Sequence, residues 1–362
     1  MSSLLIKNAT IITPTETLRR GSVFIDRGKI REVADGTIKL PERPDRTINA
    51  SGKIVVPGYI DVQVNGGNGE GFSQSSEGEY DKIVRFFVQH GTTTMLATVL
   101  TDTPGKMLEA MRNVAAFRRS KSEYARVVAG IHVEGPFLSP KRRGAHPASL
   151  LRKPNVKEVR RWLTASRGEI RMVTLAPELD NAGKVISLLK GEGIVTAVGH
   201  SYADYGCMVE SARKGLSFVT HVGNTTDWPY RKEREGGWLG AEPGVVGSFL
   251  CMEELYGSVI MDGFHFHPAM LMPVVKCKGV EKVVLITDAV FVTGLPAGIY
   301  RKGRDRVTVT EAGLTAGRRK GWLAGSTLTM DRAVRNAVKL AGLSLSEAVM
   351  MATLTPATAL GM

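Results

Sequence analysis

Short apolar runs alternate with amphipathic segments along most of the chain. The runs are rich in Val, Ile, Leu and Thr and are nearly continuous, which is typical of parallel strands buried on both faces. They lie at Ile54–Val64, Thr93–Leu100, Val127–Val133, Ile170–Ala176, Gly193–Val198, Leu216–Thr220, Gly257–Met261 and Lys282–Thr287. Between most of them, apolar residues recur at helical spacing, as Ile83, Phe86 and Phe87 do. Eight strands alternating with helices predict an α/β protein, a (β/α)8 TIM-like barrel over residues 54–362.

The first 53 residues show a different pattern. Leu4–Ile12 and Ser22–Val33 contain alternating apolar and polar positions, and a turn is expected at residues 26–29. This pattern predicts a small β-rich domain at residues 1–53, formed mainly by the N-terminal segment. A β-hairpin insertion is expected at about residues 298–321, and two helices follow near Thr327–Leu340 and Ser344–Leu354.

Composition narrows the class of protein. Of the 362 residues, 43% are hydrophobic and 23% are charged, as in ordinary globular proteins. No apolar run approaches the roughly 20 residues that span a bilayer, so no membrane partner is expected. The formal net charge is +13, but the basic residues form short scattered clusters, so no nucleic-acid partner is expected either. The first residues lack the features of a secretory signal, which predicts a cytoplasmic protein.

Polar residues gather where the predicted strands end. They are Asp61, Gln63 and Asn65 after the first strand, His132 and Glu134 after the third, His200 after the fifth, His221 after the sixth, Asp262 and His265 after the seventh, and Asp288 after the eighth. In a barrel, the carboxyl ends of all strands face one side, and active sites lie there. The sequence therefore predicts a reaction centre at this rim.

Two imidazoles and a carboxylate suit a borderline-soft divalent ion such as zinc. Glu134, His200 and His221 could supply these ligands, and a bound ion would lower the pKa of water towards about 7. Asp288 could then take the proton of that water and return it to a leaving amine. Each residue also has a structural alternative: a strand-end histidine can hydrogen-bond a carbonyl, Glu134 can form a salt bridge, and Asp288 can cap a helix.

Longer stretches of sequence point to one family. They are VVPGYIDVQVNGG, GTTTMLATVLTD, GIHVEGPFLSPKRRGAH, VTLAPE, VTAVGHS, THVGN, DGFHFHP, LITDAV, LAGSTLTM and MATLTPATALG. On these motifs the chain resembles the N-acetylglucosamine-6-phosphate deacetylases of the amidohydrolase superfamily. The matching stretches keep the family's order from about Val55 to Gly361, and HVEGPF followed by RGAH is the most specific of them.

The resemblance implies a role for each matching residue. Glu134, His200 and His221 would bind one divalent metal ion, zinc or else iron or another divalent ion. Asp288 would be the catalytic acid and base, and His146 would polarise the acetyl carbonyl. The substrate contacts implied in this way are Ala145, His146, Asn224, Thr225, Asp262, His265, Leu323, Ala324 and Gly325. A homodimer is also implied, in which His265 reaches the neighbouring subunit's site.

Gln63 and Asn65 stand where many amidohydrolases carry an HxH motif that binds a second metal. Amide oxygens are poor substitutes for imidazole at a transition metal, so one catalytic metal is expected.

The chain also departs from the family pattern. The family usually has Gly-Arg-Glu-Pro-Gly, whose arginine binds the sugar phosphate, whereas this chain has Ala241 at that position. A longer segment, TTDWPYRKEREGGW, follows Asn224, and its Arg231, Lys232 or Arg234 could replace the lost charge. Relatives continue beyond the position of Met362 into a strand of the small β domain, which is therefore expected to be thinner or completed by something else.

Three functions remain open at this point. The first is removal of the N-acetyl group of N-acetylglucosamine 6-phosphate, which gives glucosamine 6-phosphate and acetate. The second is deacetylation of a different N-acyl amino sugar or small amide, phosphorylated or not. The third is a non-catalytic regulator that binds sugar phosphates; it would be expected to have lost a ligand or Asp288, and all four residues are present.

Overall fold

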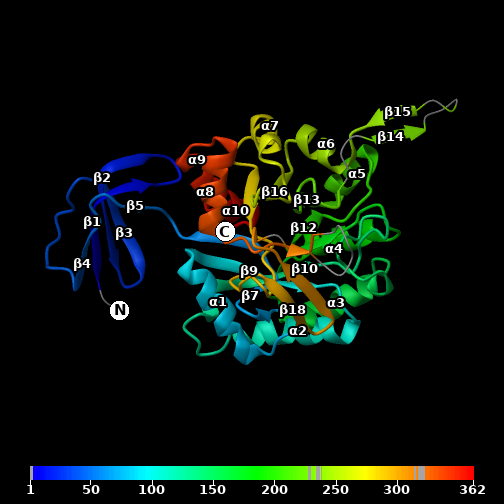
Figure 1. Ribbon diagram of the computed structural model, residues 1–362, viewed down its shortest axis with the longest axis horizontal. Coiled ribbons are helices and arrows are strands. Elements are labelled where there is room, and N and C mark those ends of the chain that lie inside the picture. Colours follow the sequence, from blue (N-terminus) through cyan, green and yellow to red (C-terminus); the bar gives the residue numbers. More distant parts are fainter. Residues whose placement is uncertain (1–2, 227–229, 234–236, 238, 314, 317–322) are drawn as a thin grey trace.

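Eight parallel strands form the centre of the protein in the computed structural model (Figure 1), which describes residues 3–226, 230–233, 237, 239–313, 315–316 and 323–362. Each strand pairs in parallel with the next one along the sheet. In chain order they are β6 (Tyr59–Val64), β9 (Thr92–Leu100), β10 (Val128–Glu134), β11 (Ile170–Leu175), β12 (Val195–Val198), β13 (Leu216–Val219), β16 (Tyr256–Ile260) and β17 (Val283–Ile286).

The sheet closes where β6 meets the residues that follow β17. Val64 forms a parallel bridge with Ala289, the Asp288 N–H donates to the Gln63 carbonyl (3.0 Å), and the Asn65 N–H donates to the Ala289 carbonyl (2.8 Å). The predicted (β/α)8 barrel is confirmed.

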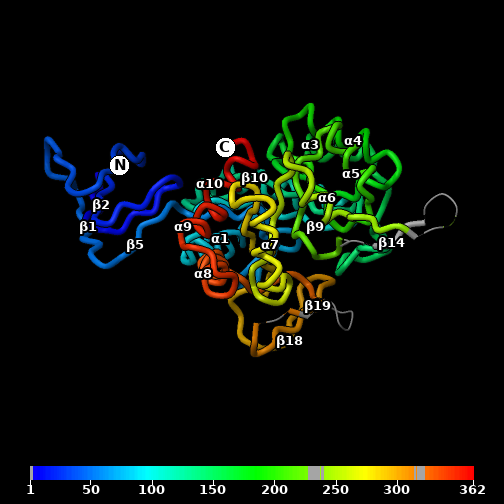
Figure 2. The backbone as a smooth tube through the Cα atoms, turned by 90° about the horizontal axis from the view of Figure 1, so that it is seen from above, coloured from blue at the N-terminus to red at the C-terminus, as the bar shows by residue number. Residues whose placement is uncertain are grey.

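Helices surround the barrel and bury their apolar faces against it (Figures 1 and 2). They are α1 (Tyr80–Gln89), α2 (Pro104–Phe117), α3 (Val156–Ser166), α4 (Ala182–Gly191), α5 (Tyr205–Lys214), α6 (Gly244–Cys251), α7 (Pro268–Lys278), α8 (Met330–Ala341), α9 (Leu345–Met351) and α10 (Leu354–Ala359). Of the apolar residues that recur at helical spacing in α1, Ile83 and Phe87 are fully buried, as expected for its inward face. Asp204 caps α5 by accepting the Cys207 N–H. None of the helices over the described residues combines the length and the apolar content that a membrane span requires.

A separate small sheet precedes the barrel and lies at one end of the molecule (Figure 1, blue). It contains β1 (Leu4–Ile12), β2 (Thr17–Asp26), β3 (Lys29–Asp35), β4 (Arg46–Asn49) and β5 (Ile54–Val55). The apolar run predicted at Ile54–Val64 divides in two, because Pro57 has no N–H to donate to a ladder. Its first part, β5, pairs with β1 in the small sheet, and its second part begins the barrel.

Short antiparallel elements extend from the carboxyl ends of the barrel strands. They are β7 (Gly66–Gly67) with β8 (Glu70–Gly71), β14 (Tyr230–Glu233) with β15 (Leu239–Glu242), and β18 (Gly298–Lys302) with β19 (Asp305–Val309) and β20 (Thr315–Ala316). The β14–β15 pair projects from the barrel in both views (Figures 1 and 2). The β18–β20 sheet lies within the range where a hairpin insertion is expected.

Candidate active site

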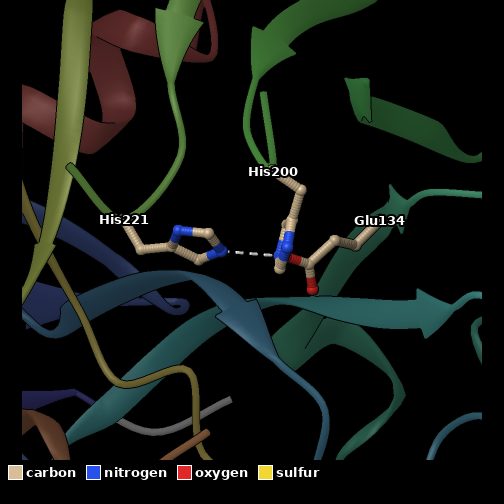
Figure 3. Close-up of side chains that lie close together, drawn as sticks. All are labelled: Glu134, His200 and His221. Atoms are coloured by element: carbon tan, nitrogen blue, oxygen red, sulfur yellow. Dashed lines mark hydrogen bonds and ion pairs between the residues drawn. The ribbon is translucent and has the colours of Figure 1, made fainter. Parts of the chain in front are cut away.

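The three predicted ligands converge at the carboxyl ends of the barrel strands β10, β12 and β13 (Figure 3). Glu134 is the last residue of β10, while His200 and His221 each lie two residues beyond their strands, β12 and β13. All three are buried, and Oε1 of Glu134 is 3.2 Å from Nε2 of His200 and 3.0 Å from Nε2 of His221. One ligand atom from each residue lies within 4.8 Å of the others.

Backbone carbonyls fix which ring nitrogens face the centre. Nδ1 of His200 donates to the Arg142 carbonyl (3.1 Å), and Nδ1 of His221 donates to the Asn224 carbonyl (3.1 Å), because a carbonyl oxygen can only accept. In a neutral imidazole, Nε2 is then a lone-pair acceptor. Two such nitrogens and a carboxylate oxygen face one another at short distance, and a cation between them would satisfy their lone pairs. The hydrogen bonds from Nδ1 to the backbone carbonyls orient the two rings, as outer-shell partners do for metal-binding histidines. The residues therefore fit a divalent ion.

The charges of this group depend on one another. Burial alone would raise the pKa of Glu134, but the facing rings of His200 and His221 outweigh it and hold that pKa well below its usual range. Burial lowers the pKa of His200, whereas for His221 the Glu134 carboxylate outweighs burial and raises the pKa. Glu134 is thus ionised at neutral pH and available as an anionic ligand.

An unusual backbone turns these side chains towards the centre. His200, His221 and Asp288 have positive φ values of 51°, 33° and 49°. Such values are uncommon outside glycine and are strained for most residues, and they cluster at functional sites. Gly199, which directly precedes His200, packs closely against β11, because an added Cβ there would lie 2.7 Å from Cγ2 of Thr174.

Asp288 lies close enough to Glu134 and His221 for their charges to affect it, and two amides hold its carboxylate. Nδ2 of Asn65 donates to its Oδ1 at 2.6 Å, and Nε2 of Gln63 donates to the same oxygen at 3.1 Å. Burial, and then the charge of Glu134, raise the pKa of Asp288 to about 6. The sequence indicated Gln63 and Asn65 only as residues that replace a second metal's ligands, and their contact with Asp288 was not foreseen.

His146 approaches the same centre from the loop after β10. Its ring packs edge-on against that of His200, with 4.6 Å between centroids. Burial, and then His200, lower the pKa of His146 to about 3, so the ring is neutral and keeps an N–H to donate. The loop is held in place by Arg143, whose Nη1 donates to the His146 carbonyl (2.7 Å).

The remaining predicted substrate contacts differ in which residues they pack against or bind. Nδ2 of Asn224 is buried and has no hydrogen-bond partner among the described residues, which suits an oxygen of a ligand. Thr225 packs near the His146 loop, since an added Cβ at Gly144 would lie 2.8 Å from its Cγ2. Asp262 accepts from Nδ1 of His265 at 2.6 Å, so within one chain these two predicted contacts pair with each other.

Of the predicted contacts Leu323, Ala324 and Gly325, the last lies against Asp288. An added Cβ at Gly325 would lie 3.7 Å from Oδ2 of Asp288, and the Thr315 hydroxyl donates to the Gly325 carbonyl. Of the suggested replacements for the phosphate-binding arginine, Arg231 is described only in its backbone and Arg234 lies outside the described residues.

The model of the amidohydrolase family matches residues 54–362, which is the whole barrel. The chain belongs to the amidohydrolase family. It is 35% identical to the N-acetylglucosamine-6-phosphate deacetylase of Bacillus subtilis (strain 168) over 336 residues, which cover 92% of this chain and 82% of that protein. It is 31% identical to the N-acetylgalactosamine-6-phosphate deacetylase of Escherichia coli O157:H7, over 96% of this chain and 90% of that protein.

Solved structures give the same result. A mutant N-acetyl-D-glucosamine-6-phosphate deacetylase from Mycobacterium smegmatis, in complex with N-acetyl-D-glucosamine-6-phosphate, matches with a TM-score of 0.89 and 34% identity. That match covers 100% of this chain and 91% of the other. The resemblance drawn from the motifs is therefore confirmed: this amidohydrolase is a hydrolase of amide C–N bonds, in a metal-dependent family, with a candidate metal site in Glu134, His200 and His221.

Proposed function

We propose that this amidohydrolase removes the N-acetyl group of N-acetylglucosamine 6-phosphate to give glucosamine 6-phosphate and acetate. The observation that supports it most is the convergence of Nε2 of His200, Nε2 of His221 and Oε1 of Glu134 beside Asp288. These groups suit hydrolysis of an unactivated amide, and the relatives named above act on N-acetylated amino sugar phosphates.

We propose zinc as the ion, because a site with two imidazoles and one carboxylate that leaves a position open is typical of catalytic zinc. An ion held by these ligands would polarise the acetyl carbonyl and lower the pKa of the attacking water. Elemental analysis of the purified protein, with one equivalent expected per chain, tests both the identity and the number of ions.

The residues of the chain would then move the protons. Asp288, ionised at neutral pH, takes a proton from the water as the water oxygen attacks the acetyl carbon. The neutral His146 donates a hydrogen bond to the acetyl oxygen, where negative charge develops. Asp288 then gives its proton to the sugar nitrogen as the C–N bond breaks, so that the nitrogen leaves as an amine and the acyl group as acetate.

The phosphate contact is the part of the pocket that differs from the family. We propose that Asn224 and Thr225 contact the phosphate, and that Arg231 replaces the charge missing at Ala241. In the β14–β15 ladder, Arg231 is the Cα partner of Ala241, so its backbone lies directly opposite the position where the family's arginine would stand. Lys232, the next residue along β14, is the Cα partner of Gly240.

A matched pair of variants tests this assignment. Arg231→Ala should raise KM for N-acetylglucosamine 6-phosphate by about tenfold or more and leave the unphosphorylated sugar unaffected, because a charge-assisted bond to phosphate contributes about 1.5–3 kcal/mol. Lys232→Ala serves as the control and should change neither. Equal effects of the two substitutions would refute a specific role for Arg231.

A second candidate is deacetylation of another N-acyl amino sugar, which Ala241 favours because it lacks the expected arginine. The similarity to a protein that deacetylates N-acetylgalactosamine 6-phosphate points the same way. Comparing kcat/KM for both N-acetylhexosamine 6-phosphates and for free N-acetylglucosamine separates the candidates. Equal values of kcat/KM with and without the phosphate would refute the first proposal.

We also propose that the protein is a homodimer, and a measurement of its molar mass in solution tests this.

A further inference from the structure

Two amide side chains bind the same oxygen of Asp288. Nε2 of Gln63 lies 3.1 Å and Nδ2 of Asn65 lies 2.6 Å from Oδ1. Both amides are almost fully buried, with 1% and 6% of their surface exposed. Their own oxygens have no hydrogen-bond partner among the described residues. Turning either amide around would bring its oxygen against the carboxylate, so an ionised Asp288 fixes the orientation in which both N–H groups donate.

The backbone at this place is fixed from three directions. Asp288 N–H donates to the Gln63 carbonyl (3.0 Å), and Asn65 N–H donates to the Ala289 carbonyl (2.8 Å), which ties β6 to the end of β17. Below them, Asp61 accepts the Gln63 N–H (3.2 Å) and the Thr287 hydroxyl (2.5 Å). The two amides therefore project from backbone that is hydrogen-bonded across the closure of the barrel, and the donors of both reach the same oxygen, Oδ1.

The second oxygen of Asp288 has different surroundings. Oδ2 has no hydrogen-bond partner among the residues that the structure describes, and it faces Gly325, where an added Cβ would lie 3.7 Å away. Gly325 belongs to the segment proposed to contact substrate. Since two donors already occupy Oδ1, a proton taken up by Asp288 is directed to Oδ2.

We propose that Gln63 and Asn65 are positioning residues for Asp288, which fix Oδ1 so that Oδ2 is the atom that exchanges the proton with water and with the leaving nitrogen. The proposal rests on the function proposed above. It gives the two amides a part in amide hydrolysis, in addition to their place where a second metal's imidazoles would stand.

Single variants of similar size test the positioning. Gln63→Met and Asn65→Leu remove the donors while keeping most of the side-chain volume. Thr98→Val is the control. Thr98 is a buried polar residue of the neighbouring strand β9, and its hydroxyl has no hydrogen-bond partner among the described residues. Misplacing a catalytic group slightly can lower the rate by about 10–100-fold. We expect kcat to fall by that factor in both amide variants, with KM, metal content and melting temperature close to those of Thr98→Val.

Two results would overturn the inference on kinetic grounds. One is an unchanged kcat in both amide variants of an active enzyme. The other is a fall in kcat that metal content matches, because the amides would then support the metal site instead of Asp288. If one amide variant fails to fold, the kcat and metal content of the other variant are sufficient for the same test.

Crystal structures supply a readout that does not depend on turnover. In the Asn65→Leu variant the Asp288 carboxylate should leave its wild-type position, and an unmoved carboxylate would contradict the proposal. In the wild type with glucosamine 6-phosphate bound, the amine should lie about 3 Å from Oδ2; a contact to Oδ1 instead would overturn the assignment. A wild type that releases no acetate would refute the proposed function, while the Asp288 position in the variant would still decide the positioning.

Discussion

Replacing Asp61 by Asn tests how the site is supported from inside the barrel. Asp61 is fully buried, and its Oδ1 accepts the N–H groups of Gln63 (3.2 Å) and Thr287 (3.3 Å) while Oδ2 accepts the Thr287 hydroxyl (2.5 Å). An asparagine has the same shape and keeps one oxygen for the two N–H groups. The Thr287 hydroxyl can turn to accept from the new amide, so each of these hydrogen bonds can be kept.

The expected magnitude follows from the ionisation of Asp61. Burial raises its pKa from 3.8 to about 7, and a rise of this size corresponds to about 4 kcal/mol. Because the folded protein holds the proton more tightly than the unfolded chain does, this contribution to stability is complete below the unfolded pKa, near 3.8. It is lost as the pH rises through 7, where the buried carboxylate must ionise. The Asp61→Asn variant has no such group and avoids this loss.

Urea unfolding of the metal-free wild type and of Asp61→Asn at pH 5 and pH 8 measures the effect. Using metal-free protein keeps the pH dependence of metal binding out of the comparison. Between the two pH values, the difference in unfolding free energy should move in favour of the variant by about 3 kcal/mol. A difference that is the same at both pH values would show that Asp61 does not change its protonation on folding.

Three further outcomes are expected. Asp288→Asn should lower kcat by about 10²–10⁴-fold, with the metal content of the wild type retained; loss of the metal would mean that Asp288 is a ligand instead. In the wild type, kcat/KM should fall on the acid side of neutral pH, because Asp288 must be ionised to accept a proton and burial raises its pKa; a profile that is flat down to pH 4 would contradict this role. Gly199→Ala, whose new Cβ would lie 2.7 Å from Cγ2 of Thr174, should lower the unfolding free energy by about 1–3 kcal/mol. Gly105→Ala, where the space is open, is the control and should not destabilise; equal melting temperatures would contradict the steric argument.

The barrel could be predicted from the sequence because parallel strands buried on both faces appear in it as nearly continuous apolar runs. The strand predicted at Thr93–Leu100 is β9 (Thr92–Leu100), and that at Ile170–Ala176 is β11 (Ile170–Leu175). The run at Ile54–Val64 was predicted as one strand, and this prediction was wrong. It considered only the apolar residues and overlooked Pro57, which lies between two strands of different sheets. The order of motifs along the chain indicated the family, which the comparisons confirm.

The detailed geometry of the site could not be predicted in the same way. Positive φ at His200, His221 and Asp288 depends on the surrounding strands and leaves no signal in the residue type. The contact of Gln63 and Asn65 with Asp288 joins segments more than 220 residues apart along the chain, and only the closure of the barrel brings them together. A usable signal did exist, since amides in place of imidazoles at a strand end raise the question of what they bind.

Acetate release from N-acetylglucosamine 6-phosphate by the purified protein, followed together with its metal content, tests the proposed deacetylation most directly. We expect one equivalent of acetate and one of glucosamine 6-phosphate per substrate, loss of turnover on chelation, and its return with one divalent ion per chain. A protein that carries its ion and still releases no acetate from any N-acetylated amino sugar would refute the proposed function.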